Sequence, residues 1–474
     1  MPHDVREYIK AVEALGELKQ IEGADWFLEI STIAQLAGAM PNPPVLLFDK
    51  IKGYPAGYRV LLPTTSSPVR ASFQLGISPQ LNTKQAAIRV LREKLNQPFN
   101  PIPPLQVQGG PVLENIQTGS DVDLFKFPAP QWFAADGGRY IGVHDTVIMR
   151  DPDEGWVNVS VNRIQIQDKT TATIFIEPGK QGDKIRRKYW EKGEACPVAV
   201  TCGGDLLVFI AAGMPMPWGL SEYDWVGWWR GEPLEVINGP FTGLPIPAYS
   251  EIALEGELFP PEAETRVEGP FPEWTGHYAP ASREPVFKVK SLMHRNNPIW
   301  VGQPFLGAGG SMGITRSLLY SADVWNNLEK TIPGVQGVWN YDRCFFVSIA
   351  QQYPEHAHQT ALAVINHRSR IMSFIVEKFI VIVDDDVDPF NPQDVLFAIM
   401  MRCDTDHLEV VKGARTRFLD PLLSLEQKEA GNFTHPAVLI SACKPYQQIK
   451  DFPPRVRTDP ELIRKARHKW GETL

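Results

Sequence analysis

Three kinds of feature are scarce in this 474-residue sequence, and each absence excludes a class of protein. No apolar run approaches the roughly 20 residues of a membrane-spanning helix, since the longest candidate, 379–383, has only the length of a strand. The five cysteines include no Cys-x-x-Cys pair, which favours core thiols in a reducing compartment over disulfides or zinc. The net charge is −8 and no basic block is present, which argues against nucleic-acid binding.

The common fingerprints of nucleotide and hydrolase sites are also missing. The glycine-rich segment 307–313 matches neither a dinucleotide fingerprint nor a Walker motif, and no Ser/His/Asp triad can be assembled from spacing. The first residues are polar and have no signal-peptide pattern. We therefore expect a cytoplasmic protein that engages neither membrane nor nucleic acid. What the sequence has in excess is 42 prolines and 13 tryptophans, which indicate fixed loops and large apolar pockets.

The length predicts roughly two to four domains, and the pattern of elements favours three. Residues 1–115 predict a small α/β domain, 116–315 a mostly β domain that is a barrel or twisted sheet, and 316–474 a second α/β domain. Helices are expected at 4–22, 84–95, 182–191, 222–230, 321–331, 356–378, 392–402 and from Pro460 onward. Strands are expected at 45–48, 59–62, 140–149, 156–167, 171–176, 197–201, 206–210, 286–292 and 379–383. The last helix carries an apolar stripe suited to a partner subunit, formed by Leu462, Ile463, Ala466 and Trp470.

The segment Glu268-Gly269-Pro270-Phe271-Pro272-Glu273 is the most informative of the chain. Two prolines and a glycine in six residues exclude a helix and restrict the backbone at two points. A stiff loop holds its two terminal carboxylates at a set separation, as acid–base chemistry requires. Surface turns rich in Pro, Gly and Glu are common, so a solvated turn is the alternative interpretation.

In one predicted strand, 156–167, the alternation of apolar and polar residues shifts by one position halfway along. Its apolar residues occupy odd positions at first and even positions from Ile164 on. Such a change predicts a one-residue bulge near Asn162, which would bring Asn158 and Arg163 onto one face. Bulges re-aim side chains at active sites and also bend barrel strands, and both interpretations stay open.

Three further features each have a functional and a plain interpretation. Ser221 opens a helix as a cap, and Glu222 after it either joins the cap or faces a bound cation. The acidic run 384–388 lacks the spacing and glycine of an EF-hand, so a solvated turn competes with a metal loop. Lys378, ahead of a buried strand, either reaches a phosphate as a point charge or lies at the surface.

In their order and spacing, these segments resemble the UbiD-type family of reversible decarboxylases, which use prenylated FMN. The resemblance covers nearly the whole chain. It is carried by Val5–Ile9, Gly16–Leu18, Asp151-Pro152, Asn158 with Arg163, Met214–Pro217, Ser221-Glu222, Glu268–Glu273 and the acidic turn Asp384–Asp388. It implies an α+β multidomain fold in which a split β-barrel binds prenylated FMN, between an N-terminal α/β segment and a C-terminal α/β domain used in oligomerisation.

The resemblance also implies roles for single residues. Arg163, Glu268 and Glu273 match the family's catalytic Glu-Arg-Glu network. Asn158 and Glu222 match two ligands of a divalent metal, Mn²⁺ or Mg²⁺, that is held against the cofactor phosphate, and K⁺ is a further candidate cation. The other cofactor-binding positions that it implies are Ser160, Val161, Asn162, Lys180, Gln181, Gly213, Met214, Pro215 and Lys378.

Gln181 departs from the family pattern. The third metal ligand of the family is a histidine in a Pro-Gly-x-His-like turn, and here that turn ends in Gln181. A glutamine offers an amide oxygen, which suits Mg²⁺ or Mn²⁺ better than softer metals. We expect a more weakly held metal, with Lys180 supplying part of the charge at the phosphate.

The chemistry of decarboxylation agrees with these roles. Loss of CO₂ from an sp² carbon leaves an anion that no side chain delocalises, so a cofactor must supply the electron sink. Arg163 beside Glu268 favours the ionised carboxylate there. Glu273 then has a raised pKa and donates the proton after CO₂ leaves, and carboxylation uses the same groups in reverse.

The expected substrate is an aromatic or heteroaromatic acid. Trp274, His277 and Tyr278 would line its pocket, and Lys180, His277 or Arg316 would bind a second polar group. Expected partners are CO₂, the prenyltransferase that makes the cofactor, and further copies of the chain in a dimer or hexamer. An FMN-dependent oxidoreductase and a non-catalytic flavin-binding relative are the alternatives.

Overall fold

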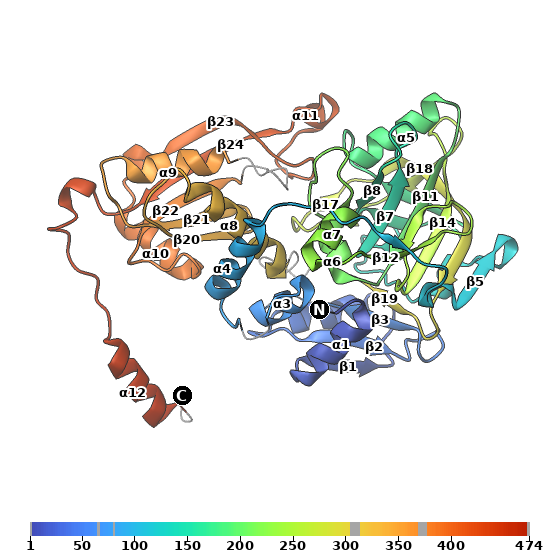
Figure 1. The fold of residues 1–474 in the computed structure, drawn as a ribbon, viewed down its shortest axis with the longest axis horizontal. Coiled ribbons are helices and arrows are strands. Elements are labelled where there is room, and N and C mark those ends of the chain that lie inside the picture. The colour runs from blue at the N-terminus through green and yellow to red at the C-terminus, as the bar shows by residue number, and fades with distance from the viewer. Residues whose placement is uncertain (1, 64–66, 79–80, 304–312, 368–376, 472–474) are drawn as a thin grey trace.

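The computed structural model describes residues 2–63, 67–78, 81–303, 313–367 and 377–471. Figure 1 shows three regions: a small N-terminal region in blue, a large central region in green and yellow, and a C-terminal region in orange and red. The fold is mixed α/β with a central β domain, as predicted. Most of the glycine-rich segment 307–313 and much of the helix predicted at 356–378 lie outside the described residues.

The N-terminal region is a four-stranded sheet with helices beside it. The strands, in sheet order, are β1 (Leu18–Glu22), β2 (Val45–Asp49), β3 (Arg59–Leu62) and β19 (Ile299–Val301). The helices are α1 (Val5–Ala14), α2 (Glu29–Gly38), α3 (Pro68–Leu75) and α4 (Lys84–Leu95). Because β19 pairs in parallel with β3, residues near 300 complete this sheet. The predicted domain boundaries at 115 and 315 stay predictions.

The first helix is shorter than the predicted 4–22. Asp4 caps its start, where the Glu7 N–H donates to Asp4 Oδ1 at 2.9 Å, and the helix ends at Ala14. Gly16 has φ +72°, a left-handed conformation that glycine adopts without strain, and the chain turns there into β1. Leu18 fits the helical spacing but pairs with Val45 in the sheet, so periodicity alone misassigned it.

The central region is built on a ten-stranded sheet whose main path runs β6-β9-β10-β18-β14-β11-β7-β8, with β5 and β15 pairing with β18. Its strands are β5 (Asn115–Thr118), β6 (Tyr140–Gly142), β7 (Asp145–Arg150), β8 (Val157–Ser160), β9 (Arg163–Ile166), β10 (Thr171–Phe175), β11 (Cys196–Cys202), β14 (Ile252–Leu258), β15 (Thr265–Glu268) and β18 (Ser282–His294). Two small sheets accompany it: β4 (Leu105–Gln106) with β12 (Glu235–Asn238) and β13 (Pro245–Pro247), and β16 (Phe271–Pro272) with β17 (Tyr278–Ala279).

The predicted one-residue bulge is in fact a break between two strands. β8 lies at one end of the sheet path and β9 near the other, yet only Val161 and Asn162 separate them in the chain. A two-residue connection spans at most about 10 Å, so the two ends of the sheet must approach each other. The sheet therefore curls into an antiparallel half-barrel, and the change of parity in the sequence marks the point where the chain passes from one end of it to the other.

The segment predicted as a strand at 206–210 is a helix. The helices of the central region are α5 (Gln181–Glu191), α6 (Leu206–Ala212) and α7 (Glu222–Arg230). The run Leu206–Ala212 is apolar throughout and gives no periodicity, and Asp205 decides the matter as an N-cap that accepts from the Leu207 N–H at 2.9 Å. The segment 213–217 therefore follows a helix and not a strand.

The C-terminal region is a five-stranded sheet covered by helices. In sheet order the strands are β20 (Val335–Tyr341), β21 (Cys344–Ile349), β22 (Phe379–Asp384), β24 (Thr434–Ala442) and β23 (Glu409–Arg415). The helices are α8 (Gly313–Leu328), α9 (His356–Ile365), α10 (Pro392–Arg402), α11 (Leu425–Glu429) and α12 (Pro460–Trp470). Short 3-10 helices of the whole chain lie at Pro111–Leu113, Gly119–Asp121, Leu124–Lys126, Thr405–His407 and Tyr446–Gln448.

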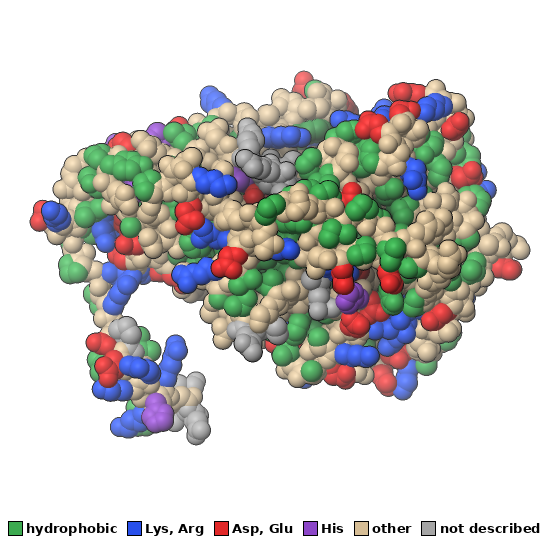
Figure 2. All heavy atoms as spheres, in the orientation of Figure 1, with side chains coloured by type: hydrophobic (Ala, Val, Ile, Leu, Met, Phe, Trp, Pro, Cys, Tyr) green, Lys and Arg blue, Asp and Glu red, His purple; other side chains and the backbone are tan. Residues whose placement is uncertain are grey.

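One buried apolar cluster joins the regions, from α3 and α4 through α6 and α7 to α8 and the C-terminal sheet. The tryptophans of α7 are among its largest members, and the Trp229 indole donates to the Leu75 carbonyl at 2.7 Å. Helix α12 lies outside this core and stands apart from the body, with basic side chains beside apolar ones (Figures 1 and 2). Among the described residues, no helix is long and apolar enough to cross a membrane.

Candidate active site

A cavity of about 530 Å³ opens where the curled sheet meets the C-terminal region, a volume typical of small-molecule sites. The central region contributes β8, β9, the first turns of α5 and α7 and the loop that contains Glu273, and the C-terminal region contributes α8 and the end of β23. The predicted site residues that line it are Asn158, Ser160, Val161, Asn162, Arg163, Lys180, Gln181, Gly213, Met214, Pro215, Glu222, Glu273, Trp274 and Arg316.

Arg163, the first residue of β9, lies between two carboxylates. Its Nε and Nη2 donate to the two oxygens of Glu268 at 2.8 and 2.7 Å, and its Nη1 donates to Glu273 Oε1 at 2.5 Å. The exposed fractions are 7% for Arg163, 0% for Glu268 and 8% for Glu273. Glu273 lines the cavity, whereas Glu268 does not. The two carboxylates are thus unequal: Glu268 is bound on both oxygens to the arginine, and Glu273 is the one that faces a ligand.

The loop between the two glutamates is fixed at both ends. β15 ends at Glu268, and β16 pairs with β17, so the loop is part of a tight hairpin, not a helix. The Glu273 N–H donates to the His277 carbonyl at 3.1 Å and closes the hairpin. The stiffness predicted from its prolines and glycine therefore has backbone hydrogen bonds to support it.

A segment that the sequence did not single out supports this loop from behind. The Tyr140 hydroxyl donates to Glu268 Oε1 at 3.0 Å, and Gln165 Oε1 accepts from the Gly269 N–H at 2.8 Å. The Gly137 N–H donates to the Pro270 carbonyl at 2.9 Å, and a Cβ at Gly137 would lie 1.9 Å from the Gly269 oxygen. Only glycine fits at position 137. The sequence signal for this contact was the pair Gly137-Gly138 ahead of a short strand.

Burial and charge act in opposite directions on the network. Burial raises the pKa of Glu273, although Arg163 pulls it down, and the raised value is the net result. Burial opposes the charge of Arg163, but its bonds to Glu268 and Glu273 outweigh burial and raise its pKa. Glu273 is therefore a buried carboxyl group that keeps its proton to higher pH than an ordinary glutamate, next to a permanent cation.

The residues that the resemblance assigns to a cation lie together at one corner of the cavity. Val159 N–H donates to Glu222 Oε2 at 2.7 Å, and burial raises the pKa of Glu222 to about 8. Asn158 Nδ2 is buried without a hydrogen-bond partner. Gln181 uses its amide N–H to donate to the Met216 carbonyl at 3.0 Å, which leaves its amide oxygen for a ligand. Glu222 and the Gln181 amide oxygen offer oxygen donors that suit a hard divalent cation, and Asn158 would join them with its amide turned so that the oxygen and not the buried Nδ2 faces the ion. The described residues contain no group of three His, Cys, Asp or Glu side chains placed to hold a metal ion.

Of the other polar residues predicted to lie near the cofactor phosphate, only some line the cavity. The Ser221 hydroxyl caps α7 by accepting from the Tyr223 N–H at 3.3 Å, as predicted. Lys180 lines the cavity and pairs with Glu177 at 3.4 Å. Lys378 lies just before β22, where its N–H donates to the Arg343 carbonyl, and it is not among the described residues that line the cavity. Its contact with a phosphate stays a prediction.

Of the four residues predicted for the substrate pocket, two line the cavity. Trp274 and Arg316 do so, whereas His277 is exposed and Tyr278 donates its hydroxyl to Asp136 at 3.0 Å, on the loop's outer side. The cavity also includes residues that the sequence reading missed, namely Tyr320, Arg415, Arg417 and Leu419. The sequence signal for this part of the cavity was the spacing of Arg415 and Arg417 at the end of a strand, because residues two apart in a strand share a face.

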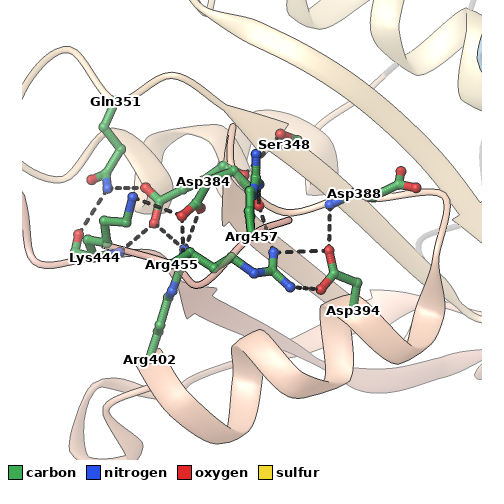
Figure 3. Close-up of polar contacts among 10 residues, drawn as sticks. Ser348, Gln351, Asp384, Asp388, Asp394, Arg402, Lys444, Arg455 and Arg457 are labelled. Carbon is green, nitrogen blue, oxygen red and sulfur yellow. Dashed lines mark hydrogen bonds and ion pairs between the residues drawn. The ribbon is translucent and has the colours of Figure 1, made fainter. Parts of the chain in front are cut away.

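The acidic turn after β22 is solvated in part: Asp385 and Asp388 are exposed, whereas Asp384 and Asp386 are ion-paired. Arg402 pairs with Asp384 at 3.0 Å and with Asp386 at 2.7 Å, and Lys444 Nζ lies 3.0 Å from Asp386 (Figure 3). Arg455 pairs with Asp394 beside them. The turn is an ion-paired junction that ties the C-terminal segment to β22 and α10.

Comparison with known proteins gives the family. The chain matches the 3-octaprenyl-4-hydroxybenzoate carboxy-lyase family over its N-terminal domain (residues 9–89), its Rift-related domain (105–307) and its C-terminal domain (314–433). It is 30% identical over 412 residues to a phenolic acid decarboxylase of a Streptomyces species, which covers 84% of this chain and 83% of the relative.

Two further relatives extend the likeness. The chain is 32% identical over 306 residues to a pyrrole-2-carboxylic acid decarboxylase of Pseudomonas aeruginosa, covering 62% of this chain and 60% of the relative. Its structure resembles that of the UbiD-class enzyme HmfF from Pelotomaculum thermopropionicum in complex with FMN, with a TM-score of 0.83, 25% identity, and 98% of each chain covered. With the matched domains in the same order along nearly the whole chain, the protein belongs to the UbiD family of carboxy-lyases.

Proposed function

We propose that this protein decarboxylates an aromatic or heteroaromatic carboxylic acid with prenylated FMN, and that the same groups carry the reverse reaction. The observation that carries the proposal is Arg163 held between Glu268 and Glu273 at the wall of a ligand-sized cavity. The named relatives support the substrate class, since they act on phenolic acids and on pyrrole-2-carboxylic acid. FMN in the similar HmfF structure supports the flavin.

The residues of the cavity corner would hold the cofactor's phosphate through a divalent cation. Asn158 and Gln181 would contribute amide oxygens and Glu222 a carboxylate, a donor set that suits Mn²⁺ or Mg²⁺. With only one charge in this set, Lys180, which lines the same cavity, would add positive charge at the phosphate. Prenylated FMN, when bound, supplies the electron sink that cleavage of a bond to an sp² carbon requires.

The protein's own groups then orient the acid and move one proton. The Arg163 guanidinium, fixed from behind by Glu268, presents positive charge to the substrate carboxylate. The bond between the ring carbon and the carboxyl carbon breaks and CO₂ leaves. The proton on the Glu273 carboxyl group goes to that ring carbon, and Glu273 regains a proton from solvent, so atoms and charge balance. Burial raises the pKa of Glu273, so this carboxyl group keeps that proton to higher pH than an ordinary glutamate.

Production with and without a flavin prenyltransferase tests the proposal. With the prenyltransferase, the purified protein should show absorbance beyond that of FMN and should release CO₂ from phenolic acids or pyrrole-2-carboxylate. Protein that holds only FMN should release none. A protein that binds the modified flavin but neither releases CO₂ nor exchanges it with any ring acid would be a non-catalytic relative. Flavin reduction by a nicotinamide without CO₂ release would instead indicate an oxidoreductase.

Self-association as a dimer or hexamer is part of the proposal. The support is α12, whose apolar residues Leu462, Ile463 and Trp470 are 59%, 40% and 50% exposed. Sedimentation of the full chain measures the assembly, and a monomer at micromolar concentration would contradict it.

A further inference from the structure

We propose that the substrate carries a second carboxylate, so that the protein acts on an aromatic or heteroaromatic dicarboxylate; this rests on the proposed decarboxylase function. The C-terminal region places three guanidinium groups at the cavity: Arg316 on α8, Arg415 at the end of β23, and Arg417 two residues later. Arg163 already provides one cation for the carboxylate that is lost. A second set of arginines in the same cavity therefore points to a second anionic group on the ligand.

Arg417 lies close to the catalytic network by two routes. Its guanidinium is 5.3 Å from the ring centre of Trp274, the residue that follows Glu273. The next residue, Phe418, is 6.0 Å from Phe175, and the Phe175 ring carries the Arg163 guanidinium at 4.0 Å. Trp274 thus links the Arg417 guanidinium to Glu273, the residue beside it in the chain. The second route runs from the neighbouring Phe418 through Phe175 to Arg163. A planar ring bound between Arg163 and Arg417 would place one substituent at each.

The arginines of this wall have partners within the protein. Burial lowers the pKa of Arg417, but Tyr320, Glu377 and Glu177 outweigh burial and raise it, and Arg316 donates to the Gly213 carbonyl at 3.1 Å. Arg417 lies 3.7 Å from Glu377 Oε1, and that glutamate is shared with Arg343 at 3.4 Å. The Nε of Arg417 is buried without a hydrogen-bond partner, and Arg415 is exposed. Burial lowers the pKa of Arg316, and its neighbour Arg417 adds to that effect. A buried donor without an acceptor and crowded cations both cost stability, and an anionic ligand would relieve both costs.

A carboxylate fits these groups better than a neutral hydroxyl. Guanidinium binds carboxylate through two parallel N–H···O bonds, with matching charge and geometry, whereas a neutral phenol accepts without charge. The cofactor phosphate is the other anion expected in the cavity, but its predicted contacts, apart from Lys378, come from the central region. The flavin content of the variants below separates the two possibilities.

The test uses the holoenzyme with matched acids: pyrrole-2-carboxylate against pyrrole-2,5-dicarboxylate, and 4-hydroxybenzoate against benzene-1,4-dicarboxylate. The wild type should have at least a tenfold higher kcat/KM for the dicarboxylate of one pair. Arg417→Met should raise KM for that dicarboxylate about 10- to 100-fold more than KM for its monoacid, with kcat changed less than threefold. Arg316→Met should act in the same direction. Arg266→Met, which loses an exposed pair with Glu264, is the control and should change neither.

Distinct outcomes overturn this inference and the proposed function. A wild type that prefers the monoacids refutes the inference and leaves the decarboxylase standing. Equal losses for both acids in Arg417→Met, or loss of bound flavin, assign Arg417 to folding or to the cofactor and also refute it. If the flavin is intact and no acid is decarboxylated, the proposed function fails. Calorimetric binding of the dicarboxylate, weakened by Arg417→Met, would then still support the inference, and absence of binding would refute it.

Discussion

Two of the arginine–carboxylate networks in this molecule differ in a way that bears on function, one around Arg163 at the cavity and one around Arg402 behind the acidic turn. In the first, a single guanidinium serves two glutamates. In the second, Arg402 and Lys444 together surround Asp386, and Asp384 also accepts from the Lys444 N–H at 2.7 Å and from Gln351 at 2.6 Å (Figure 3). The first network is short of donors, and the second is well supplied with them.

The difference appears in the protonation of the carboxyl groups. Burial raises the pKa of Asp386, but the bonds from Arg402 and Lys444 outweigh burial and hold it below its usual value. For Glu273 burial wins over the one guanidinium, and the pKa is raised. A network rich in cations keeps its carboxylates ionised and acts as a structural junction. A network with one cation for two carboxylates, open to a cavity, holds a transferable proton.

The largest expected effect is that of Glu273→Gln on catalysis. The amide keeps the shape and the hydrogen bond to Arg163 but has no acidic proton, so kcat should fall about 10³-fold. Thermal unfolding should change little, because the amide oxygen still accepts the hydrogen bond from Arg163 and the side chain keeps its volume. Glu177→Gln is the matched control, a cavity glutamate that pairs with Lys180 and not with Arg163, and should cost less than tenfold. Full activity of Glu273→Gln would remove it as proton donor.

Arg402→Met should have the opposite effect: it should lower the free energy of unfolding and leave catalysis nearly unchanged. It leaves Asp384 and Asp386 without their shared guanidinium, and breaking a buried pair costs about 3–5 kcal/mol. Denaturant unfolding should report that loss, while holoenzyme kcat at a temperature below unfolding stays near the wild-type value. Arg266→Met, an exposed pair, should cost less than about 1 kcal/mol. A stable variant that has lost activity would reverse the roles assigned to the two networks.

The pH dependence should separate the two networks. Glu273 has a raised pKa and acts as an acid, so kcat should stay high through the ordinary glutamate range and fall about tenfold per unit above its folded pKa. Asp386 has a lowered pKa, so its contribution to stability is present above the ordinary aspartate pKa and is lost as the pH falls through the folded value. Parallel profiles of kcat and Tm in the same buffers check this. If kcat and Tm both fell only at low pH, or both only at high pH, the assignment of different roles to the two networks would be wrong.

Tyr140→Phe should have the smallest effect of this series. It removes the hydroxyl that donates to Glu268, and such bonds to charged groups are worth about 1.5–3 kcal/mol. Because Arg163 still holds both oxygens of Glu268, we expect the low end, about a tenfold fall in kcat. Tyr278→Phe loses a similar bond, to Asp136, without touching the network and should cost less. Equal effects of the two changes would mean that Tyr140 supports only the loop.

The elements that the sequence predicted well have strong local signals. Helices α4, α7 and α10 begin at a capping Thr83, Ser221 and Asn391, and the side-chain bonds of these residues are local in the chain. The run Leu206–Ala212 was misassigned because a short, wholly apolar segment satisfies strand and helix equally. The end of α1 was missed because Leu18 kept a helical spacing in a strand that only its pairing with Val45 reveals.

At the site, sequence reading together with the family resemblance predicted the different roles of Glu268 and Glu273, but not the contacts that support them. Residue types and loop stiffness marked Glu268 and Glu273 as a carboxylate pair, and the change of parity marked the turn at Asn162 that positions Arg163. Tyr140 and Arg417 were missed because nothing in their neighbours indicates what they contact. Their partners, Glu268 and Trp274, lie more than a hundred residues away in the chain.

The sequence by itself determined the family, most of the elements and the residue types of the Arg163 network, because these depend on local patterns. The tertiary structure alone decided that Glu273 and not Glu268 faces the cavity, and that the acidic turn is ion-paired. Arg163 is 105 residues from Glu268 and 110 from Glu273, and the burial and charge that set them apart exist only once the sheet has curled. Electrostatic differences of this kind arise from desolvation and from distant partners, which no local pattern encodes.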